Sequence, residues 1–223
     1  MIGQETEKYR TTVTDRVWLD QETYTLTCQR PARWSFQAGQ YVSLSHAGEE
    51  REYTLISSPE DQAVRFLIKR LDGGRLSVAL AEVEPGTSLG MSPAKGYLIY
   101  QTTDRPVLFM ANGVGIAPFV AMVTAGCTGF TLLHGARTLT GLYFREVLLH
   151  AAHRFIPCLT DAPAAGNALP DLFRGRVTEC AAQVLPPDRY DVYLCGSRSM
   201  ITAMMLLLDQ HCPESRIYSE AYT

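Results

Sequence analysis

The sequence predicts an N-terminal antiparallel β-barrel followed by an α/β domain built on a parallel sheet. Short alternating strands separated by glycine fill the chain before Gln101, and after Pro106 buried strands alternate with helical stretches. A length of 223 residues is sufficient for two small domains. The polar stretch Gln101–Arg105 marks the change, so we expect domains of residues 1–101 and 102–223.

The strands expected in the first domain are short and half-buried. Thr23–Cys28 and Gln40–Ser45 alternate apolar and polar side chains with a period of two, and Ala63–Lys69 is a third apolar run. Turn residues separate these runs at the spacing of a small barrel, at Gly39, Gly48, Gly73, Gly74, Pro85 and Gly86.

The second domain alternates buried strands with helices, which indicates βαβ units. A glycine-rich turn and a helical stretch follow the first of these strands, and further helices are expected near Gly141–Ala151 and over Met200–Leu208. The strands are expected at Val107–Ala111, Phe130–His134, Arg154–Leu159, Tyr190–Leu194 and Arg216–Tyr218.

The composition fits a globular protein and excludes several classes. With 46% hydrophobic and 19% charged residues the chain can fill a core, and a net charge of −3 excludes a strongly basic nucleic-acid binder. Met200–Leu208 is much shorter than the roughly 20 residues that cross a bilayer. The first residues contain no apolar segment, so we expect no secretory signal and a cytoplasmic protein.

No metal centre is expected. The six cysteines are irregularly spaced without a Cys-x-x-Cys motif, so neither an iron–sulfur cluster nor a structural zinc site is predicted, and reduced thiols are expected. His150 and His153 have the i, i+3 spacing of a helical metal pair, but no third ligand accompanies them.

The segment Asn112–Pro118 has the features of a strand-to-helix turn that binds a pyrophosphate. Gly113 and Gly115 carry no side chain, so a phosphate could approach the backbone, and the start of a helix offers free amide donors. Pro118 suits a first helical turn because its missing donor is not needed there. A tight turn packed for its own sake would have the same residues.

Two segments of the first domain could bind a phosphate and a ring. Arg51 and Tyr53 share one face of a strand, which places a fixed cation beside a flat aromatic group, with the hydroxyl of Thr54 one step further on. Gly73 and Gly74 precede a short expected helix that includes Ser77. The backbone amides at the start of this helix could hold a phosphate. Taken singly, Arg51 and Tyr53 could be a surface arginine beside a core tyrosine. The segment that begins at Gly73 could likewise be an ordinary capped helix.

Five motifs occur in order along the chain. They are Arg51-x-Tyr53-Thr54 with Ser57 and Ser58, Gly74-Arg-Leu-Ser77, Gly113-x-Gly115-x-x-Pro118, Cys195-Gly-Ser-Arg-Ser-Met200 and Glu220-Ala-Tyr222. Together they resemble the motifs of the ferredoxin–NADP reductase superfamily, over most of the chain from Gln40 onward. His134-Gly-Ala-Arg137 with Leu142-Tyr143 is similar to the bacterial ferredoxin or flavodoxin reductases.

The resemblance implies a six-stranded barrel that holds FAD and an α/β domain that binds NAD(P). Tyr53 and Tyr222 would lie against the two faces of the isoalloxazine ring, and Arg51 would neutralise phosphate with help from Ser77. The implied FAD residues are Arg51, Tyr53, Thr54, Ser58, Ile68, Gly74, Arg75, Leu76, Ser77 and Tyr222. The implied NAD(P) residues are Gly113, Val114, Gly115, Pro118, Arg137, Thr160, Asp161, Arg176, Cys195, Gly196 and Met200.

The resemblance also implies catalytic roles for Thr54, Cys195 and Glu220. Thr54 would lie near flavin N5, and Cys195 would shape the place where nicotinamide C4 meets N5 without acting as a nucleophile. Glu220 would assist hydride or proton movement at the flavin edge. Tyr222 would have to move aside for the nicotinamide, so a gated hydride transfer is expected.

Three positions depart from the family pattern. Val114 replaces the usual threonine, and Thr223 extends the chain past the terminal aromatic residue. Arg137 and Arg176 match positions that hold the 2′-phosphate of NADP, but Asp161 stands where bacterial members have another arginine. A carboxylate there would bind a free ribose diol, so the pattern favours NADPH slightly and leaves use of both nucleotides open.

The expected function is electron transfer between NAD(P)H and a ferredoxin- or flavodoxin-type carrier through bound FAD. Without cluster-binding cysteines, the carrier has to be a separate protein or a small molecule. An NAD(P)H:flavin reductase, which releases its flavin, is the first alternative. A flavin-holding subunit of a larger redox complex is the second.

Overall fold

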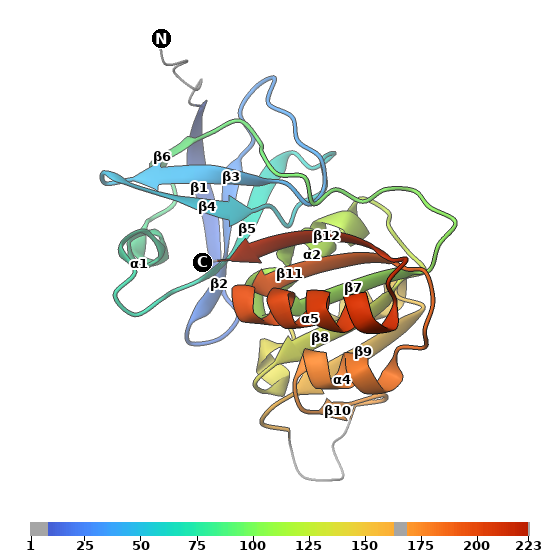
Figure 1. Cartoon of the computed structure of the whole chain (residues 1–223). Helices are drawn as coiled ribbons and strands as arrows, with labels where there is room; N and C mark the ends of the chain where they lie inside the picture. The colour runs from blue at the N-terminus through green and yellow to red at the C-terminus, as the bar shows by residue number, and fades with distance from the viewer. Residues whose placement is uncertain (1–8, 163–168, 223) are drawn as a thin grey trace, which may run out of the picture. The chain divides into compact units, whose positions relative to one another are not determined.

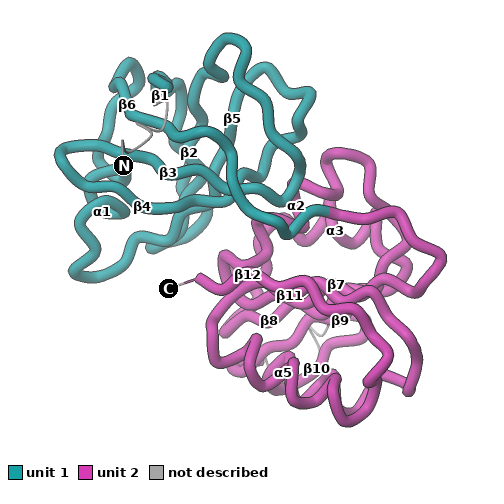
Figure 2. Tube along the Cα trace, turned by 45° about the horizontal axis from the view of Figure 1, so that its top comes forward, with its two compact units in different colours: residues 1–99 teal, residues 100–223 magenta. Residues whose placement is uncertain are grey.

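The computed structural model describes residues 9–162 and 169–222 and divides the chain into two compact units, residues 1–99 and 100–223 (Figure 2). Each unit has a hydrophobic core of its own. The stretch expected to contain the boundary, Gln101–Arg105, lies at the start of the second unit and belongs to no helix or strand.

The first unit is a nearly closed antiparallel barrel, as the sequence predicts. Six strands pair in the order β4-β3-β6-β1-β2-β5, and a bridge between Leu55 and Phe66 links the two outer strands (Figure 1). The elements are β1 Tyr9–Trp18, β2 Thr23–Gln29, β3 Tyr41–His46, β4 Glu49–Thr54, β5 Ala63–Lys69, α1 Arg75–Glu82 and β6 Ser88–Met91.

Alternation of side chains builds the barrel core. Tyr24 and Leu26 of β2 point inward opposite Ile68 and Phe66 of β5, and all four are buried. The short helix α1 adds Leu76 to the same core. β1 and β6 lie outside the expected strands, because a register shift after Val13 interrupts the alternation of β1 and β6 has only 4 residues.

The second unit is a six-stranded parallel sheet in the order β10-β9-β8-β7-β11-β12, which confirms the predicted α/β class. Helices α4 and α5 pack together on one face of the sheet, and α2 and α3 pack together on the other (Figures 1 and 2). The elements are β7 Val107–Asn112, η1 Gly113–Ile116, α2 Ala117–Thr124, β8 Thr131–Ala136, η2 Leu139–Gly141, α3 Arg145–Ala151, β9 Arg154–Leu159, β10 Phe173–Arg174, α4 Val177–Val184, β11 Asp191–Ser197, α5 Arg198–His211 and β12 Arg216–Tyr222.

The strand order places a topological switch point between β7 and β11. From β7 the chain proceeds through β8 and β9 in one direction, and then returns to add β11 and β12 on the other side. Open parallel sheets bind ligands outside the carboxyl ends of their strands at such a point. Both predicted nucleotide turns, after Asn112 and after Cys195, lie there.

One helix begins later than the sequence suggests. The expected segment Gly141–Ala151 contains the end of η2 and an irregular turn before α3 starts at Arg145. Phe144 has a φ of +57°, a left-handed conformation that interrupts a helix. β10 and α4 lie outside the expected elements.

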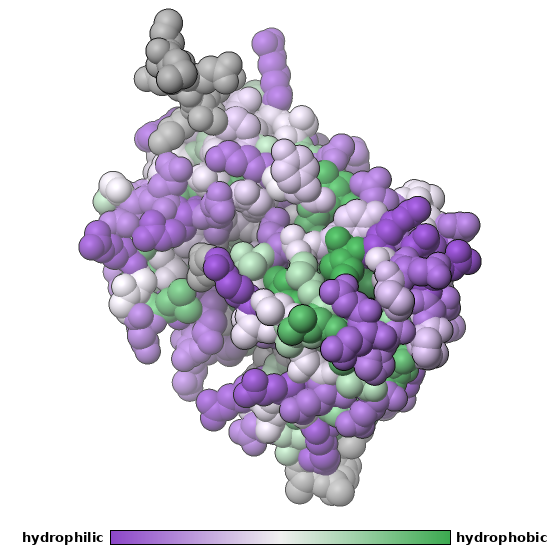
Figure 3. Space-filling model, viewed as in Figure 1, coloured by the Kyte–Doolittle hydropathy of each residue, from purple (hydrophilic) through white to green (hydrophobic). Residues whose placement is uncertain are grey.

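The surface shown in Figure 3 is mainly hydrophilic, with apolar side chains gathered over the second unit. One of the exposed apolar residues of that unit is Leu206 of α5, which is 60% exposed. Single exposed leucines are ordinary on globular proteins. No helix in residues 9–162 or 169–222 has the length and apolar character needed to cross a bilayer.

Candidate functional site

The predicted flavin motif lies on β4 and the segment that follows it. Arg51 and Tyr53 share one face of the strand, opposite Leu44 and Val42 of β3. Tyr53 is half-buried against the barrel core, and burial raises the pKa of its phenol to about 12. The side chain of Arg51 is 65% exposed. The strand therefore presents a half-buried aromatic ring beside a solvent-exposed cation.

The hydroxyl groups after β4 are buried. Thr54, Ser57 and Ser58 are each less than a tenth exposed. The Ser57 hydroxyl accepts a hydrogen bond from the Arg65 amide at 3.2 Å, and the Ser58 hydroxyl accepts one from the Glu60 amide at 3.3 Å. Ser57 and Ser58 thus bind the backbone of the turn that follows, which fixes the end of the strand.

The start of α1 is the second predicted phosphate segment. Gly74 precedes the helix, and among the described residues no side chain caps the first turn. The Ser77 hydroxyl accepts a hydrogen bond from the Leu71 amide at 3.2 Å, and a Cβ added at Gly74 would lie only 2.6 Å from that hydroxyl oxygen. Gly74 is required because Ser77 folds back over the turn. The first-turn amides remain available to an anion.

Two of the implied FAD residues have their side chains in the barrel core. Ile68 and Leu76 are 1% and 2% exposed and belong to the main core cluster of the first unit. Their side chains therefore pack the barrel, and only their backbone groups could reach a ligand.

Glu49 is a residue of this region that no motif indicated. Its Oε1 lies 2.8 Å from Arg75 Nη1, and its Oε2 lies 3.9 Å from Arg51 Nη1. The hydrogen bond from Arg75 lowers the pKa of the Glu49 carboxyl. One carboxylate therefore contacts both arginines of the predicted flavin site. In the sequence, the one signal for the contact between Glu49 and Arg51 is their i, i+2 spacing, which places both on the same face of a strand.

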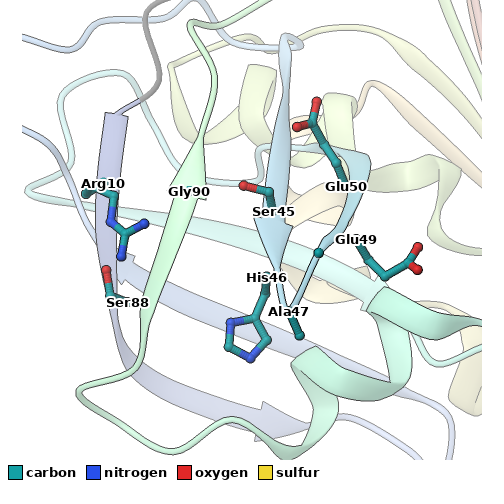
Figure 4. A pocket seen from close by; sticks show the side chains of 9 residues that line it. Arg10, Ser45, His46, Ala47, Glu49, Glu50, Ser88 and Gly90 are labelled. Carbon is teal, nitrogen blue, oxygen red and sulfur yellow. The ribbon is translucent and has the colours of Figure 1, made fainter.

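A separate cavity of about 480 Å³ lies beside the β3–β4 hairpin (Figure 4). In Figure 4 the side chains of Arg10 and Ser88 lie close together, and the carboxylate of Glu49 points away from them. The residues around this cavity are Arg10, Ser45, His46, Ala47, Gly48, Glu49, Glu50, Ser88 and Gly90. None of the predicted site residues is among them.

In the second unit, the predicted dinucleotide turn runs from β7 into η1. Gly113 has a φ of +54°, and a Cβ added there would meet no atom within 4 Å. Gly115 is different, because its added Cβ would lie 2.4 Å from the Cys195 carbonyl oxygen. Gly113 thus leaves open space at the turn, whereas Gly115 is needed for packing against β11. Val114 is half-buried between them, and Pro118 is buried in the first turn of α2.

Asn112 ties this turn to the one after β11. Its Oδ1 accepts a hydrogen bond from the Ser197 amide at 2.9 Å, and its Nδ2 donates to the Ser197 hydroxyl at 3.0 Å. A Cβ added at Gly196 would lie 2.0 Å from Asn112 Oδ1, so only glycine fits there. No local sequence pattern predicts this pairing, because the two residues are 85 positions apart.

The residues implied in catalysis on this unit gather at the ends of β11 and β12. Cys195 is paired in register with Glu220, and Ser197 with Tyr222. Cys195 is fully buried; burial raises the pKa of its thiol well above the ordinary value, the Glu220 carboxylate raises it further, and the Tyr222 hydroxyl opposes the shift. The thiol is therefore uncharged at neutral pH. Met200, which closes the motif, packs into the core of the unit.

The predicted ribose-phosphate residues lie at the ends of β8 and β9 and at the start of α4. The Asp161 amide donates to the Arg137 carbonyl at 2.8 Å, and their side chains form an exposed ion pair with 3.9 Å between Nε and Oδ2. Thr160 is exposed beside them, and Arg176 is exposed at the start of α4. The positive charge of Arg137 is thus partly neutralised by Asp161, the residue that we expect to repel a phosphate.

Both units match known protein families in chain order. The oxidoreductase FAD-binding domain family matches residues 10–100, and the oxidoreductase NAD-binding domain family matches residues 109–205. The chain belongs to the ferredoxin–NADP reductase superfamily. It consists of an oxidoreductase FAD-binding domain followed by an oxidoreductase NAD-binding domain.

Similar members of the superfamily include reductase components of oxygenase systems. The naphthalene 1,2-dioxygenase system ferredoxin–NAD(P)(+) reductase component of Pseudomonas putida is 31% identical over 85% of this chain. The propane 2-monooxygenase reductase component of Mycolicibacterium smegmatis is 26% identical over 86% of it. The chain spans 61% of the length of each of these two relatives.

Solved structures of the superfamily have the same fold. A ferredoxin–NADP+ reductase of Neisseria gonorrhoeae with bound FAD and NADP gives a TM-score of 0.81 at 20% identity, covering 96% of this chain and 99% of that one. A cytochrome P450 reductase of Amycolatopsis gives 0.81 at 24% identity, covering 97% and 70%.

The residues present fit the two cofactors of the superfamily. In the barrel, the uncapped first turn of α1 and the guanidinium groups of Arg51 and Arg75 suit the phosphates of a flavin nucleotide. In the second unit, the open space at Gly113 and the start of η1 suit the pyrophosphate of a dinucleotide. Tyr222 is the only implied FAD residue that the second unit contributes.

His134 of β8 is buried close to the dinucleotide turn. Neither ring nitrogen forms a hydrogen bond among the described residues, and burial lowers the pKa of the ring to about 4, which the nearby Gly113 backbone only partly opposes. His150 instead bonds the Glu146 carbonyl at 2.7 Å on exposed α3. Within residues 9–162 and 169–222, no three His, Cys, Asp or Glu side chains are placed to hold a metal ion.

Proposed function

We propose that this protein moves hydride between NAD(P)H and bound FAD and exchanges single electrons with a separate ferredoxin or flavodoxin. The observation that carries the proposal is the register of β11 and β12, which brings Cys195, Glu220 and Tyr222 together at the switch point of the sheet. Residues 1–101 would bind the flavin and residues 102–223 the nicotinamide nucleotide. All six cysteines are buried and unpaired with one another, which supports a cytoplasmic location.

When bound, FAD supplies the redox chemistry by taking up hydride and releasing electrons one at a time. The chain's task is to hold and aim the two nucleotides. Tyr53 offers a fixed ring face, and Arg51 with the α1 amides binds phosphate. Thr54 contributes a buried hydroxyl near the reacting edge.

On the nucleotide side, Cys195 forms a neutral wall, and Glu220 holds or moves a proton beside it. The burial of Cys195 supports these separate roles for Cys195 and Glu220, because an uncharged thiol excludes water without attracting a cation. Tyr222, at the end of β12, would supply a ring face to the flavin and would have to move aside for the nicotinamide. Gly113 and the first turn of η1 bind the pyrophosphate, and Arg137, Thr160, Asp161 and Arg176 surround the ribose of the adenosine half.

The Arg137–Asp161 ion pair supports use of both NADH and NADPH. The carboxylate can accept hydrogen bonds from a free 2′-hydroxyl, and the two arginines can bind a 2′-phosphate. Because Asp161 already neutralises part of the Arg137 charge, Arg176 remains the stronger phosphate ligand.

An NAD(P)H:flavin reductase is the second candidate, and Glu49 is the observation that favours it. A carboxylate between the two phosphate-binding arginines weakens the hold on a flavin nucleotide, so the flavin could leave as a product. Rapid mixing with NADH or NADPH distinguishes the candidates. For the first, the purified protein carries FAD, which is bleached by either nucleotide and reoxidised by ferredoxin or flavodoxin.

A colourless protein that reduces added riboflavin would support the second candidate. FAD that binds but is not bleached by either nucleotide would instead indicate a flavin-holding subunit, and would overturn both.

A further inference from the structure

Glu49 occupies the position between the two cations that the proposed function assigns to flavin phosphate. It begins β4, two residues before Arg51 on the same strand face, and Arg75 is the first residue of α1. The distances from its carboxylate oxygens are 2.8 Å to Arg75 and 3.9 Å to Arg51. The carboxylate therefore stands where an anion bridging both arginines would bind.

The two arginines are solvent-exposed, whereas Glu49 is not. The side chains of Arg51 and Arg75 are 65% and 78% exposed, while that of Glu49 is 24% exposed. Exposed guanidinium groups can rotate toward a ligand, but the half-buried carboxylate stays beside them. A phosphate that binds these arginines must therefore share them with a fixed negative charge.

We propose that Glu49 is a specificity-determining residue that weakens binding of flavin nucleotides by competing with their phosphates for Arg51 and Arg75. The inference rests on the proposed function, in which this unit binds a flavin through those arginines. The competition acts on charged flavin nucleotides and not on riboflavin, which has no phosphate. It thereby lowers the preference of the site for FAD over the uncharged flavin.

A purely structural role for Glu49 predicts a different result. If the ion pair with Arg75 only fastened α1 to β4, its loss would loosen the first turn of α1 and weaken FAD binding. Exposed ion pairs contribute little to folding stability, so this loss should be small. The charge effect on a bound phosphate should be larger, since it acts over a few ångströms on a group that carries more than one charge.

The test compares Glu49→Gln with Glu52→Gln in full-length apoprotein. Glu52 lies on the same strand but points to the opposite face, opposite Ser43, so the control removes the same charge from the other side. Dissociation constants are measured by fluorescence titration with FAD and with riboflavin, at low and at high salt.

We expect Glu49→Gln to bind FAD about three- to tenfold more tightly at low salt, with less gain at high salt, and riboflavin within about twofold of wild type. Glu52→Gln should behave as wild type with both flavins. Unchanged or weaker FAD binding in Glu49→Gln, or an equal change with riboflavin, would overturn the inference. A wild-type protein that binds neither flavin would overturn the proposed function itself.

Discussion

At the scale of single residues, burial decides what Cys195 can do. Its thiol is fully buried, and its pKa is raised by desolvation and by Glu220. The thiolate is the reactive form of cysteine, so a group that stays protonated at neutral pH is neither a nucleophile nor a ready target for alkylation. We therefore propose that Cys195 contributes to the shape of the nicotinamide site.

This argument predicts a modest effect of Cys195→Ser. Flavin reduction by NADH or NADPH should slow by about tenfold, as expected for a small misplacement. Loss of a true nucleophile costs on the order of 10⁴-fold or more. Stopped-flow reduction measures the rate, and iodoacetamide at pH 8 should leave Cys195 unlabelled in native wild type but label it after denaturation. Rapid native labelling would contradict the assignment.

Asp161 is the residue that should set the balance between the two nucleotides. In Asp161→Arg the ion pair with Arg137 is replaced by two cations beside Arg176, which favours a 2′-phosphate. We expect the ratio of kcat/KM for NADPH to that for NADH to rise about tenfold or more. Asp209→Arg, an equal charge change on exposed α5, is the control and should leave the ratio unchanged. An unaltered ratio in Asp161→Arg would place the ribose phosphate elsewhere.

At the scale of elements, the two nucleotide turns act as one unit because Asn112 joins them. The side-chain amide of Asn112 forms hydrogen bonds with both the backbone amide and the hydroxyl of Ser197. Gly115 and Gly196 have no side chains, so the two turns can approach closely. The starts of η1 and α5 are held at a fixed spacing in this way. The shape of the switch point thus depends on the side chain of Asn112, which directly precedes Gly113 and bonds Ser197 of the second motif.

Removing this link should disturb nucleotide binding more than flavin binding. Asn112→Ala leaves the Ser197 amide without its partner and should cost about 1–3 kcal/mol of stability. The KM for NAD(P)H should rise about tenfold, with a smaller change in kcat and an unchanged FAD content. Ser199→Ala, which loses only a 3.3 Å contact to the Ser197 hydroxyl, is the matched control. Equal effects of the two variants would count against a positioning role.

The elements also show what could be predicted from the sequence. Ala63–Lys69 and Arg154–Leu159 match β5 and β9 to the residue, because buried strands between turn residues leave a clear pattern. The predicted start of α3 was wrong, because no local sequence pattern indicates that Phe144 has a left-handed backbone conformation. Contacts between residues far apart in the sequence could not be predicted, because no local pattern indicates them. Examples are the contacts of Glu49 with Arg75 and of Asn112 with Ser197. The motifs thus predicted candidate site residues, but not the carboxylate of Glu49 that pairs with two of them.

At the scale of the whole molecule, anion binding depends on local geometry and not on net charge. The chain carries a net charge of −3, with 20 basic and 23 acidic residues, yet two nucleotides with negative phosphates are its cofactors. We propose that uncapped helix starts and single arginines provide the attraction over a few ångströms. A negative net charge does not favour binding of polyanions.

The stability of the molecule toward acid should depend on His134. Its ring is buried, neither nitrogen has a hydrogen-bond partner that meets the geometric criteria among residues 9–162 and 169–222, and burial lowers its pKa to about 4 from the usual 6.5. Between these values the unfolded chain binds a proton that the folded chain does not, so stability is full above about pH 6.5 and falls as the pH drops toward 4. The contribution to the unfolding free energy is about 2 kcal/mol between pH 7 and pH 5.

His134→Phe replaces the imidazole with an aromatic ring that does not titrate, and it removes two buried polar nitrogens from the core. The variant should be at least as stable as wild type at pH 7 and more stable by about 2 kcal/mol at pH 5, measured by denaturant unfolding at both values. His150→Gln, on exposed α3, should follow the wild-type pH dependence. If the curves for His134→Phe and wild type stay parallel from pH 7 to pH 5, His134 is not the group that links folding to acid.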